Sequence, residues 1–310
     1  MRGTFSMHLT ILCAPAALAL VSGSATAQPA SYAGGKWDPD AWAQLFVNAG
    51  ARIAGVQMEH HDGFALWDSK VNEWNSLSKG PMLNLAKLHV DAFRKQGLKI
   101  MAAFHHAYNF QGYWQNVPKQ TDPSLQKLYG QLSGPNTWGY VAGMTYYNPA
   151  AIIHQFIDRV SKNGNLLLNI CPMADGTIPK EQQDTLMAIG TFLKQFGTAI
   201  YETRAWTVYG EGPTKMGGCS ICAPTSGTSQ DVRYTRSKDG DAVYALLLGW
   251  PGNGKQVNLT SVTTSRFALG SGKVFLFAPV GGSATSLQFT DVHRRQRDGA
   301  WRLYGWRRYG

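Results

Sequence analysis

Segments typical of helices and of buried strands alternate along the middle of the chain, and this alternation constrains the fold more than any other feature. The expected helices are residues 39–48, 83–96, 149–162 and 179–196. The expected strands are residues 52–58, 98–104 and 165–170. Strands that alternate with helices in this way form a parallel sheet, either open or closed into a barrel. The pattern therefore predicts the α/β class for this part of the chain.

The ends of the expected helices carry characteristic signals. Asp38 stands where it can cap the first helix, and Pro39 suits the first helical position because its nitrogen carries no hydrogen to leave unpaired. Gly97 and Gly197 follow the second and the last helix, where a glycine can end a helix without a steric penalty. These signals set the bounds of the predicted helices.

After about residue 215 the pattern changes to short alternating strands between segments rich in glycine and serine. The expected strands are residues 232–236, 242–248, 255–259, 273–277 and 286–289. Short strands that follow one another closely in this way are typical of antiparallel sheets. We therefore expect a small antiparallel β-sandwich over residues 216–290.

The N-terminus has the features of a secretory signal peptide. Arg2 precedes an apolar run from Leu9 to Val21, and Ala25-Thr26-Ala27 provides a cleavage site with small residues. We expect residues 1–27 to be removed after Ala27, which predicts a secreted or periplasmic protein. The run is too short for a good membrane span, and no other stretch reaches the roughly 18 apolar residues that a span needs.

The C-terminal residues 291–310 carry much of the positive charge. Six arginines stand there against two aspartates, and without this tail and Arg2 the formal net charge of +10 falls by half. The tail is either a basic and aromatic arm for nucleic acid or a membrane surface, or an unstructured end. Because it has neither helical nor strand periodicity, we expect the unstructured end and no nucleic-acid partner.

Polar and aromatic side chains directly follow two of the expected strands. His60 and His61 come after the first strand, and Trp67 lies a few residues further on. His105 comes directly after the second strand. Residues that follow parallel strands in an α/β barrel lie together at one face, where such folds place their active sites. Imidazoles hydrogen-bond hydroxyl groups and indole rings offer an apolar face, so the pattern favours a sugar-binding site.

Two other roles for these histidines stay open. Adjacent histidines can both bind a metal ion, but neighbouring side chains of a strand point to opposite faces, and no motif supplies a third ligand. They could also be core residues that hydrogen-bond within the fold, above all His106. We expect no metal ion and no cofactor.

Longer motifs resemble the α-L-fucosidases of glycoside hydrolase family 29. The first motif reads EHHDGFALWDS, and a later one contains LKIMAAFHHAYNF. The segments that carry the resemblance are residues 59–69, 74–76, 93–110, 138–140, 163–169, 172–179 and 190–206. Together they cover most of residues 36–250, in the order that the family has.

The resemblance implies a (β/α)8-like barrel over residues 28–215 and exo-acting removal of terminal α-linked L-fucose from glycans, with retention of configuration. His60 and His61 would hold hydroxyl groups of the fucose, and Trp67 would line the pocket. His105 would contact the sugar from a further strand end. The implied partners are fucosylated glycans or glycoconjugates, and the oligomeric state is left open.

The chain departs from the family pattern where the catalytic carboxylates belong. A retaining glycosidase needs two carboxylates about 5–5.5 Å apart, one as the nucleophile and one as the acid/base. The family's nucleophile is an Asp at the end of a Trp-Phe-Asp strand, and the segment that should hold it is reduced here to residues 130–137. Neither catalytic residue can be assigned from the sequence, and Glu59 and Asp62 are poor substitutes.

The family's early strand is missing as well, because residues 33–35 lead straight into the first helix. The barrel region holds about 180 residues, fewer than the ~250 of a complete eight-stranded barrel. We therefore predict an incomplete barrel and a fucosidase-type hydrolase whose activity is absent or severely reduced. The alternative is a fucose-binding protein without catalysis.

Overall fold

The computed structural model describes residues 9–13, 36–59, 63–104, 140, 145–173, 175–216, 224–240, 242–252, 255, 257–262, 274–277 and 301–302. The chain forms two compact units. The parallel-sheet unit comprises Leu9–Tyr146 and Leu167–Met187, and the antiparallel unit comprises Met1–His8, Tyr147–Leu166 and Ala188–Gly310.

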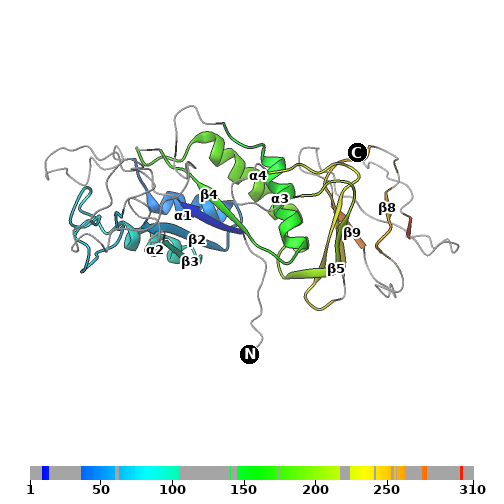
Figure 1. Ribbon diagram of the computed structural model, residues 1–310, viewed down its shortest axis with the longest axis horizontal. Helices are drawn as coiled ribbons and strands as arrows, with labels where there is room; N and C mark the ends of the chain where they lie inside the picture. The colour runs from blue at the N-terminus through cyan, green and yellow to red at the C-terminus, as the bar shows by residue number, and fades with distance from the viewer. Residues whose placement is uncertain are drawn as a thin grey trace, which may run out of the picture. The chain divides into compact units, whose positions relative to one another are not determined.

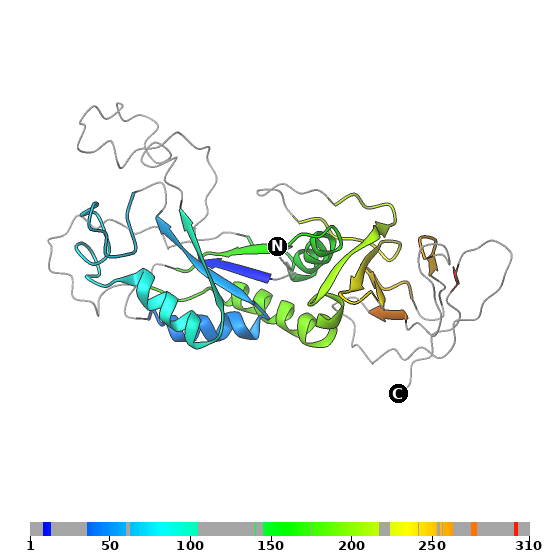
Figure 2. The same cartoon turned by 90° about the horizontal axis from the view of Figure 1, so that it is seen from below.

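A four-stranded sheet forms the centre of the parallel-sheet unit (Figure 1). Its strands are β1 (Leu9–Cys13), β2 (Ile53–Glu59), β3 (Lys99–Phe104) and β4 (Leu166–Ile170). Their order is β3-β2-β1-β4, and β2 runs parallel to both β1 and β3, so the three arrows point the same way in Figure 2. The predicted strands β2, β3 and β4 are confirmed. β1 comes from residues that were expected to belong to a signal peptide.

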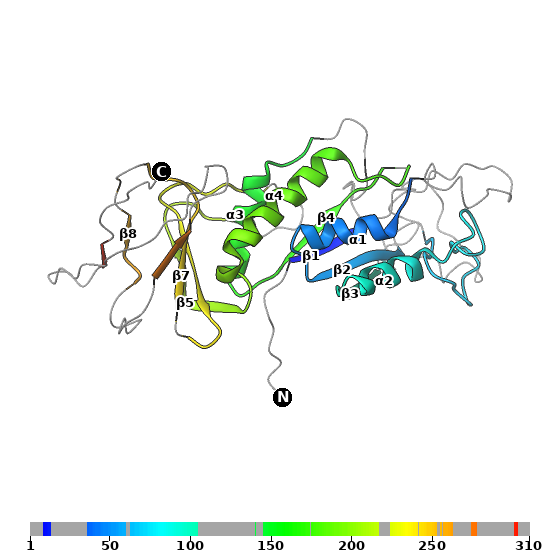
Figure 3. The ribbon, with the colours of Figure 1, turned by 180° about the vertical axis from the view of Figure 1, so that it is seen from behind.

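Two helices, α1 (Pro39–Asn48) and α2 (Leu85–Lys95), pack on each other, and α2 packs on β2 and β3 (Figure 3). The Asp38 side chain accepts hydrogen bonds from the N–H groups of Asp40 and Ala41, which confirms the predicted cap. Phe46 of α1 and Phe93 of α2 are fully buried with ring centroids 5.6 Å apart. Burying an apolar side chain of this size contributes roughly 1.5–3 kcal/mol, so this contact holds the two helices together.

The antiparallel unit contains a second four-stranded sheet and the helix α3 (Pro149–Ser161). The strands are β5 (Thr203–Glu211), β6 (Val232–Ser237), β7 (Val243–Leu247) and β9 (Val274–Phe277), in the order β5-β6-β7-β9. β6 runs antiparallel to β5 and β7, whereas β7 and β9 run parallel. The expected antiparallel sheet is therefore confirmed except at this last pair.

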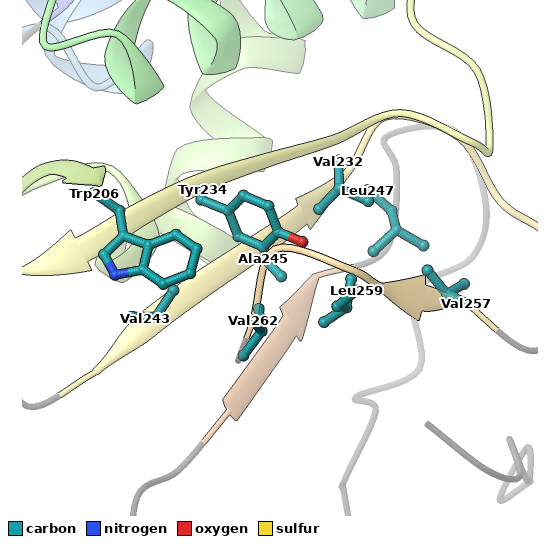
Figure 4. Close-up of a cluster of buried hydrophobic side chains, with 9 residues drawn as sticks. All are labelled: Trp206, Val232, Tyr234, Val243, Ala245, Leu247, Val257, Leu259 and Val262. Carbon is teal, nitrogen blue, oxygen red and sulfur yellow. The ribbon is translucent and has the colours of Figure 1, made fainter. Parts of the chain in front are cut away.

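Apolar side chains from this sheet and the segments beside it form a compact core (Figure 4). Trp206 of β5 packs edge to face on Tyr234 of β6, with ring centroids 5.2 Å apart. The other members of the core are Val232, Val243, Ala245, Leu247, Val257, Leu259 and Val262. Apolar and aromatic residues at alternate positions of β6 and β7 enter this core, as the period of two in the sequence predicts.

A buried ion pair fastens α3 to β6. The Nε of Arg233 lies 2.6 Å from the Oδ1 of Asp158, and the two side chains are 2% and 5% exposed. Lys162 Nζ lies 2.7 Å from the other carboxylate oxygen of Asp158 and sits 4.7 Å from the ring centre of Tyr209. The carboxylate is therefore compensated by two cations, as a buried charge requires.

Two elements that precede residue 216 are attached to the second sheet. β5 pairs with β6, and α3 packs on β5 and β6, so both elements belong with the second sheet. The tail also differs from the expected unstructured end at one place. Its short strand β10 (Trp301–Arg302) pairs antiparallel with β8 (Asn258–Leu259). The strand expected at 286–289 lies outside the described residues.

The last long helix, α4 (Lys180–Phe196), ends in a 3-10 turn, η4 (Gly197–Ala199). This helix confirms the predicted one at 179–196 within a residue. None of the helices in the described part of the chain is both long enough and apolar enough to cross a membrane.

Candidate functional site

The candidate site lies where β2 and β3 end. The two strands are parallel, so their carboxyl ends lie at the same edge of the sheet, which we call the carboxyl edge. Of the predicted site residues, Trp67 is described by the structure. His60, His61 and His105 lie outside the described residues, as does Asp62.

Trp67 joins the segment after β2 to the end of β3. Its indole meets the ring of Phe104 edge to face, with centroids 5.6 Å apart and an interplanar angle of 75°. Phe104 is 55% exposed and Trp67 is half-buried, so this aromatic pair is accessible to solvent. Phe104 is the last residue of β3 and immediately precedes His105 in the chain. Phe104 could not be predicted as the partner of Trp67, because the contact joins a loop residue to the end of a strand 37 positions later in the chain.

A compact segment, residues 63–84, holds Trp67 in place. Leu66 donates its N–H to the carbonyl of Met58 in β2 at 2.9 Å, which attaches the segment to the strand. Ala65 forms a β-bridge with Asn75, with backbone hydrogen bonds on both sides of the bridge. The position of Trp67 is thus fixed by bonds on the residues that precede it.

Three buried polar side chains donate hydrogen bonds to backbone carbonyls inside this segment: Asn72, Asn75 and Ser76. Asn72 Nδ2 donates to the carbonyl of Gly63 at 3.1 Å, and Asn75 Nδ2 donates to the carbonyl of Asn72 at 2.7 Å. The Ser76 hydroxyl donates to the carbonyl of Leu66 at 2.8 Å. The Trp74-Asn75-Ser76 motif therefore has a structural use here, because buried backbone carbonyls need these donors.

Acidic groups also lie in this unit, but none of them can be assigned a catalytic role. Glu59, the last residue of β2, is 2% exposed, and its carbonyl accepts a hydrogen bond from Gln57 Nε2 at 2.8 Å. Asp68 pairs with Lys70 at 2.7 Å. The nucleophile Asp and the acid/base Glu of a retaining glycosidase stay unassigned among the described residues.

The loop after β4 is bound to the start of α1. Trp42 Nε1 donates to the carbonyl of Gly176 at 3.1 Å, and Lys36 pairs with Asp175 at 3.0 Å. The side chain and backbone N–H of Thr177 donate to Asp175, and together with Lys36 they lower the pKa of this carboxyl group to about 2. Asp175 is therefore an ionised acceptor and no proton donor near neutral pH.

A buried histidine supports the same region from α2. The His89 ring lies 5.1 Å from that of Trp37 and 5.3 Å from that of Trp42. Trp37 Nε1 donates to His89 Nε2 at 3.2 Å, and His89 Nδ1 lies 2.9 Å from the carbonyl of Leu85. Burial lowers the pKa of His89 to about 4, so the ring is neutral and carries its proton on Nδ1.

Cys171 follows β4 directly and is buried. Burial raises the pKa of its thiol to about 11, which makes it a poor nucleophile. Within the part of the chain that the structure describes, no three His, Cys, Asp or Glu side chains form a group that could hold a metal ion.

The sequence profile of one family, described as alpha-L-fucosidase, matches residues 26–134 and 130–198, which together make up more than half of the chain. The chain belongs to the α-L-fucosidase family. The family resemblance of the motifs around Trp67 and Asn75 is therefore confirmed.

Curated α-L-fucosidases align along much of the chain. Human tissue alpha-L-fucosidase is 27% identical over 319 residues, which cover 73% of this chain and 65% of the human one. The alpha-L-fucosidase of Branchiostoma floridae is 24% identical over 360 residues, which cover 86% of this chain and 76% of that enzyme. The chain thus spans slightly less than two thirds of the human enzyme's length.

Solved fucosidase structures share the fold. The structure of Thermotoga maritima alpha-fucosidase in complex with fucose has a TM-score of 0.62 at 18% identity, covering 96% of this chain and 91% of that chain. Alpha-L-fucosidase isoenzyme 1 from Paenibacillus thiaminolyticus has a TM-score of 0.56 at 18% identity, covering 82% and 84% of the two chains.

The family profile matches the chain in two separate segments. These segments overlap at residues 130–134, within the stretch where the sequence leads us to expect lost residues. The alignment with the human enzyme runs over 319 positions, although it covers only 73% of a chain of 310 residues. The human fucosidase therefore has residues between the aligned segments that have no counterpart here.

Proposed function

We propose that this chain is an exo-acting, retaining α-L-fucosidase-type hydrolase that binds the terminal L-fucose of glycans at the carboxyl edge and hydrolyses it at a severely reduced rate. The Trp67–Phe104 contact carries this proposal, because it joins the segment after β2 to the end of β3 in one accessible aromatic surface. His60, His61 and His105 would supply the hydrogen bonds to the sugar hydroxyl groups. A supporting precedent is Thermotoga maritima alpha-fucosidase, whose structure was solved in complex with fucose.

The proposed architecture is an incomplete (β/α)8-like barrel followed by a small β-sandwich. The order of β2, α2 and β3, with parallel strands on both sides of a helix, is the repeating unit of such a barrel. The similarity to solved fucosidases supports this assignment. Residues 28–215 would form the barrel domain, apart from β5, which pairs with the sheet of the sandwich proposed for residues 216–290.

The proposed loss of activity rests on the missing carboxylates. Glycosidase catalysis with retention requires a nucleophile and an acid/base that face one another across the sugar. The family match in two segments supports their loss, since the segments overlap where the sequence leaves no room for the nucleophile strand. Without a covalent nucleophile, the rate falls by several orders of magnitude.

Hydrolysis of 4-nitrophenyl α-L-fucoside by the purified full chain tests this proposal. We expect kcat/KM to lie at least about a thousandfold below that of the Thermotoga maritima enzyme measured in parallel. A value within about tenfold of that enzyme would refute the proposed loss of the carboxylates. Glu59→Gln is the matched variant. If its residual turnover equals that of the parent protein, Glu59 does not replace the missing catalytic carboxylates.

A second candidate function is fucose binding without any turnover. The exposed Phe104 beside Trp67 favours it, because this surface needs no carboxylate in order to stack on a sugar. Three results together would support this function. The full chain binds L-fucose in a calorimetric titration, the His61→Ala variant shows no heat of binding, and the parent protein releases no nitrophenol. Measurable, enzyme-dependent release of nitrophenol would favour the first candidate.

We also propose that the chain is exported by the signal peptide predicted at residues 1–27. The plasma and tissue enzymes among its relatives are compatible with this location. Mass spectrometry of the protein from the culture medium or the periplasm tests the proposal, with a new N-terminus at Gln28 as the expected result. An intact Met1 on all exported protein would contradict it.

A further inference from the structure

β1 (Leu9–Cys13) occupies an interior position of the sheet. Its neighbours are β2 on one side and β4 on the other. The pairing with β2 is parallel and runs from Thr10 opposite Ile53 to Cys13 opposite Val56 without interruption. Arg52 donates its N–H to the carbonyl of Leu9 at 3.1 Å, one residue before β2 begins. β1 is therefore joined to the sheet by a regular ladder.

The side chains of β1 contribute to the core as well. Leu9 and Ile11 are both fully buried, and they belong to the largest fully buried side chains of the described chain. Residues two apart in a strand point to the same face, so these two side chains enter the same layer of the core. An apolar pair at this spacing is what an interior strand needs.

This strand lies outside the family-matched part of the chain. The family profile begins at residue 26, whereas β1 ends at Cys13. Both α1 and β2 lie inside the match, as do β3 and β4. The sheet thus combines three strands that align with the family with one strand that does not.

We propose that the space between β2 and β4 is a strand-acceptor site and that Leu9–Cys13 is the strand that fills it. The site takes an extended, apolar segment in parallel register with β2, as in β-strand addition. The apolar N-terminal segment then has two uses that exclude each other, as a leader for export and as an interior strand. This inference does not depend on the proposed action on fucose.

Removal of residues 1–27 would therefore change the sheet. The edges of β2 and β4 that face β1 would lose their backbone partners, and the buried neighbours of Leu9 and Ile11 would lose apolar contacts. Unpaired strand edges and exposed core are unfavourable and promote association with other chains. The uncleaved chain is accordingly expected to be the more stable form.

Hydrogen–deuterium exchange on the full chain tests the proposal directly. The protein is purified with its N-terminus intact, as checked by its mass, and exchange is followed in peptides that cover residues 9–13. Paired interior amides exchange slowly, so we expect protection comparable with that of residues 53–59 in β2. Exchange as fast as that of a synthetic peptide of the same sequence would overturn the proposal.

Two charge substitutions provide a matched comparison in the full chain. Ile11→Asp places a carboxylate at a fully buried position of β1, whereas Ala102→Asp places one at an exposed position of β3. We expect Ile11→Asp to lower Tm by at least about 10 °C and Ala102→Asp by no more than about 2 °C. Equal effects would overturn the proposal. If Ile11→Asp does not fold, Ile11→Val replaces it. We expect Ile11→Val to lower Tm by a smaller amount, and an unchanged Tm would contradict the proposal.

Discussion

The two units of the molecule bury polar side chains for different purposes. In the antiparallel unit the buried charges of Arg233 and Asp158 compensate each other and hold a helix to a sheet. In the parallel-sheet unit the buried amides of Asn72 and Asn75 bind backbone carbonyls of the segment that carries Trp67. The first arrangement stabilises an interface between elements, whereas the second fixes the shape of a loop beside an exposed aromatic surface.

This difference supports the proposed position of the site. Buried polar groups are costly unless they are satisfied, so a loop with several of them is built for a defined conformation. Such a loop stands at the carboxyl edge of the parallel sheet, which is where α/β folds bind their ligands. Changes in the antiparallel unit should therefore affect stability alone, and changes at the carboxyl edge should affect binding.

The largest effect is expected from Asp158→Asn in the antiparallel unit. It removes the carboxylate shared by Arg233 and Lys162 and leaves a buried guanidinium without its counter-charge. We expect a loss of about 3–5 kcal/mol in the free energy of unfolding, measured by urea denaturation. Asp40→Asn breaks an exposed pair with Lys95 and should cost less than about 1 kcal/mol. Similar losses for both variants would contradict this account of the buried pair.

A somewhat smaller loss of stability is expected when the pH is lowered, and it arises from His89 in the parallel-sheet unit. The pKa of folded His89 is about 4, below its ordinary value of 6.5, so between these values the unfolded chain binds a proton that the folded chain excludes. Stability is therefore lost as the pH falls from about 6.5 to about 4, by a total of about 3 kcal/mol from this group. Urea denaturation of the parent and of His89→Phe over this range measures it. An identical pH dependence in both proteins would show that His89 is not responsible.

The smallest of these effects concerns the loop after β4. Gly176 has a φ of +85°, and a Cβ atom there would lie 2.5 Å from the Cβ of Trp37. Gly176→Ala should therefore destabilise the protein by about 2 kcal/mol. Gly97 has a similar φ of +73° but has no atom within 4 Å of such a Cβ, so Gly97→Ala should cost about 1 kcal/mol. A larger loss at Gly97 in thermal or urea unfolding would contradict the steric argument.

Much of the fold could be predicted because the relevant signals are local. Asp38 caps α1 by bonds to residues two and three positions away, and the apolar runs of β2 and β3 are visible in their own sequences. The incorporation of Leu9–Cys13 in the sheet was not predictable in this way. A short apolar segment has the same composition whether it serves as a leader or as a buried strand, and its pairing with β2 joins residues more than forty positions apart.

The position of Trp67 was predictable for the same reason. Trp67 could be selected from its place after an expected strand, and the structure places it at the carboxyl edge. Phe104 was overlooked because an apolar residue at the end of a strand resembles any core residue until its exposure is known. The support from His89 and Trp42 was overlooked too, because it depends on packing between α1, α2 and the loop after β4.

Calorimetric titration of L-fucose into the full chain tests the central claim most directly. If the carboxyl edge binds fucose, the parent protein binds it, and Trp67→Ala weakens binding at least about tenfold, or roughly 1.4 kcal/mol. Trp250→Ala removes a tryptophan that is 42% exposed in the antiparallel unit and should leave the affinity unchanged. No heat of binding from the parent protein, or an equal loss in the two variants, would contradict the claim.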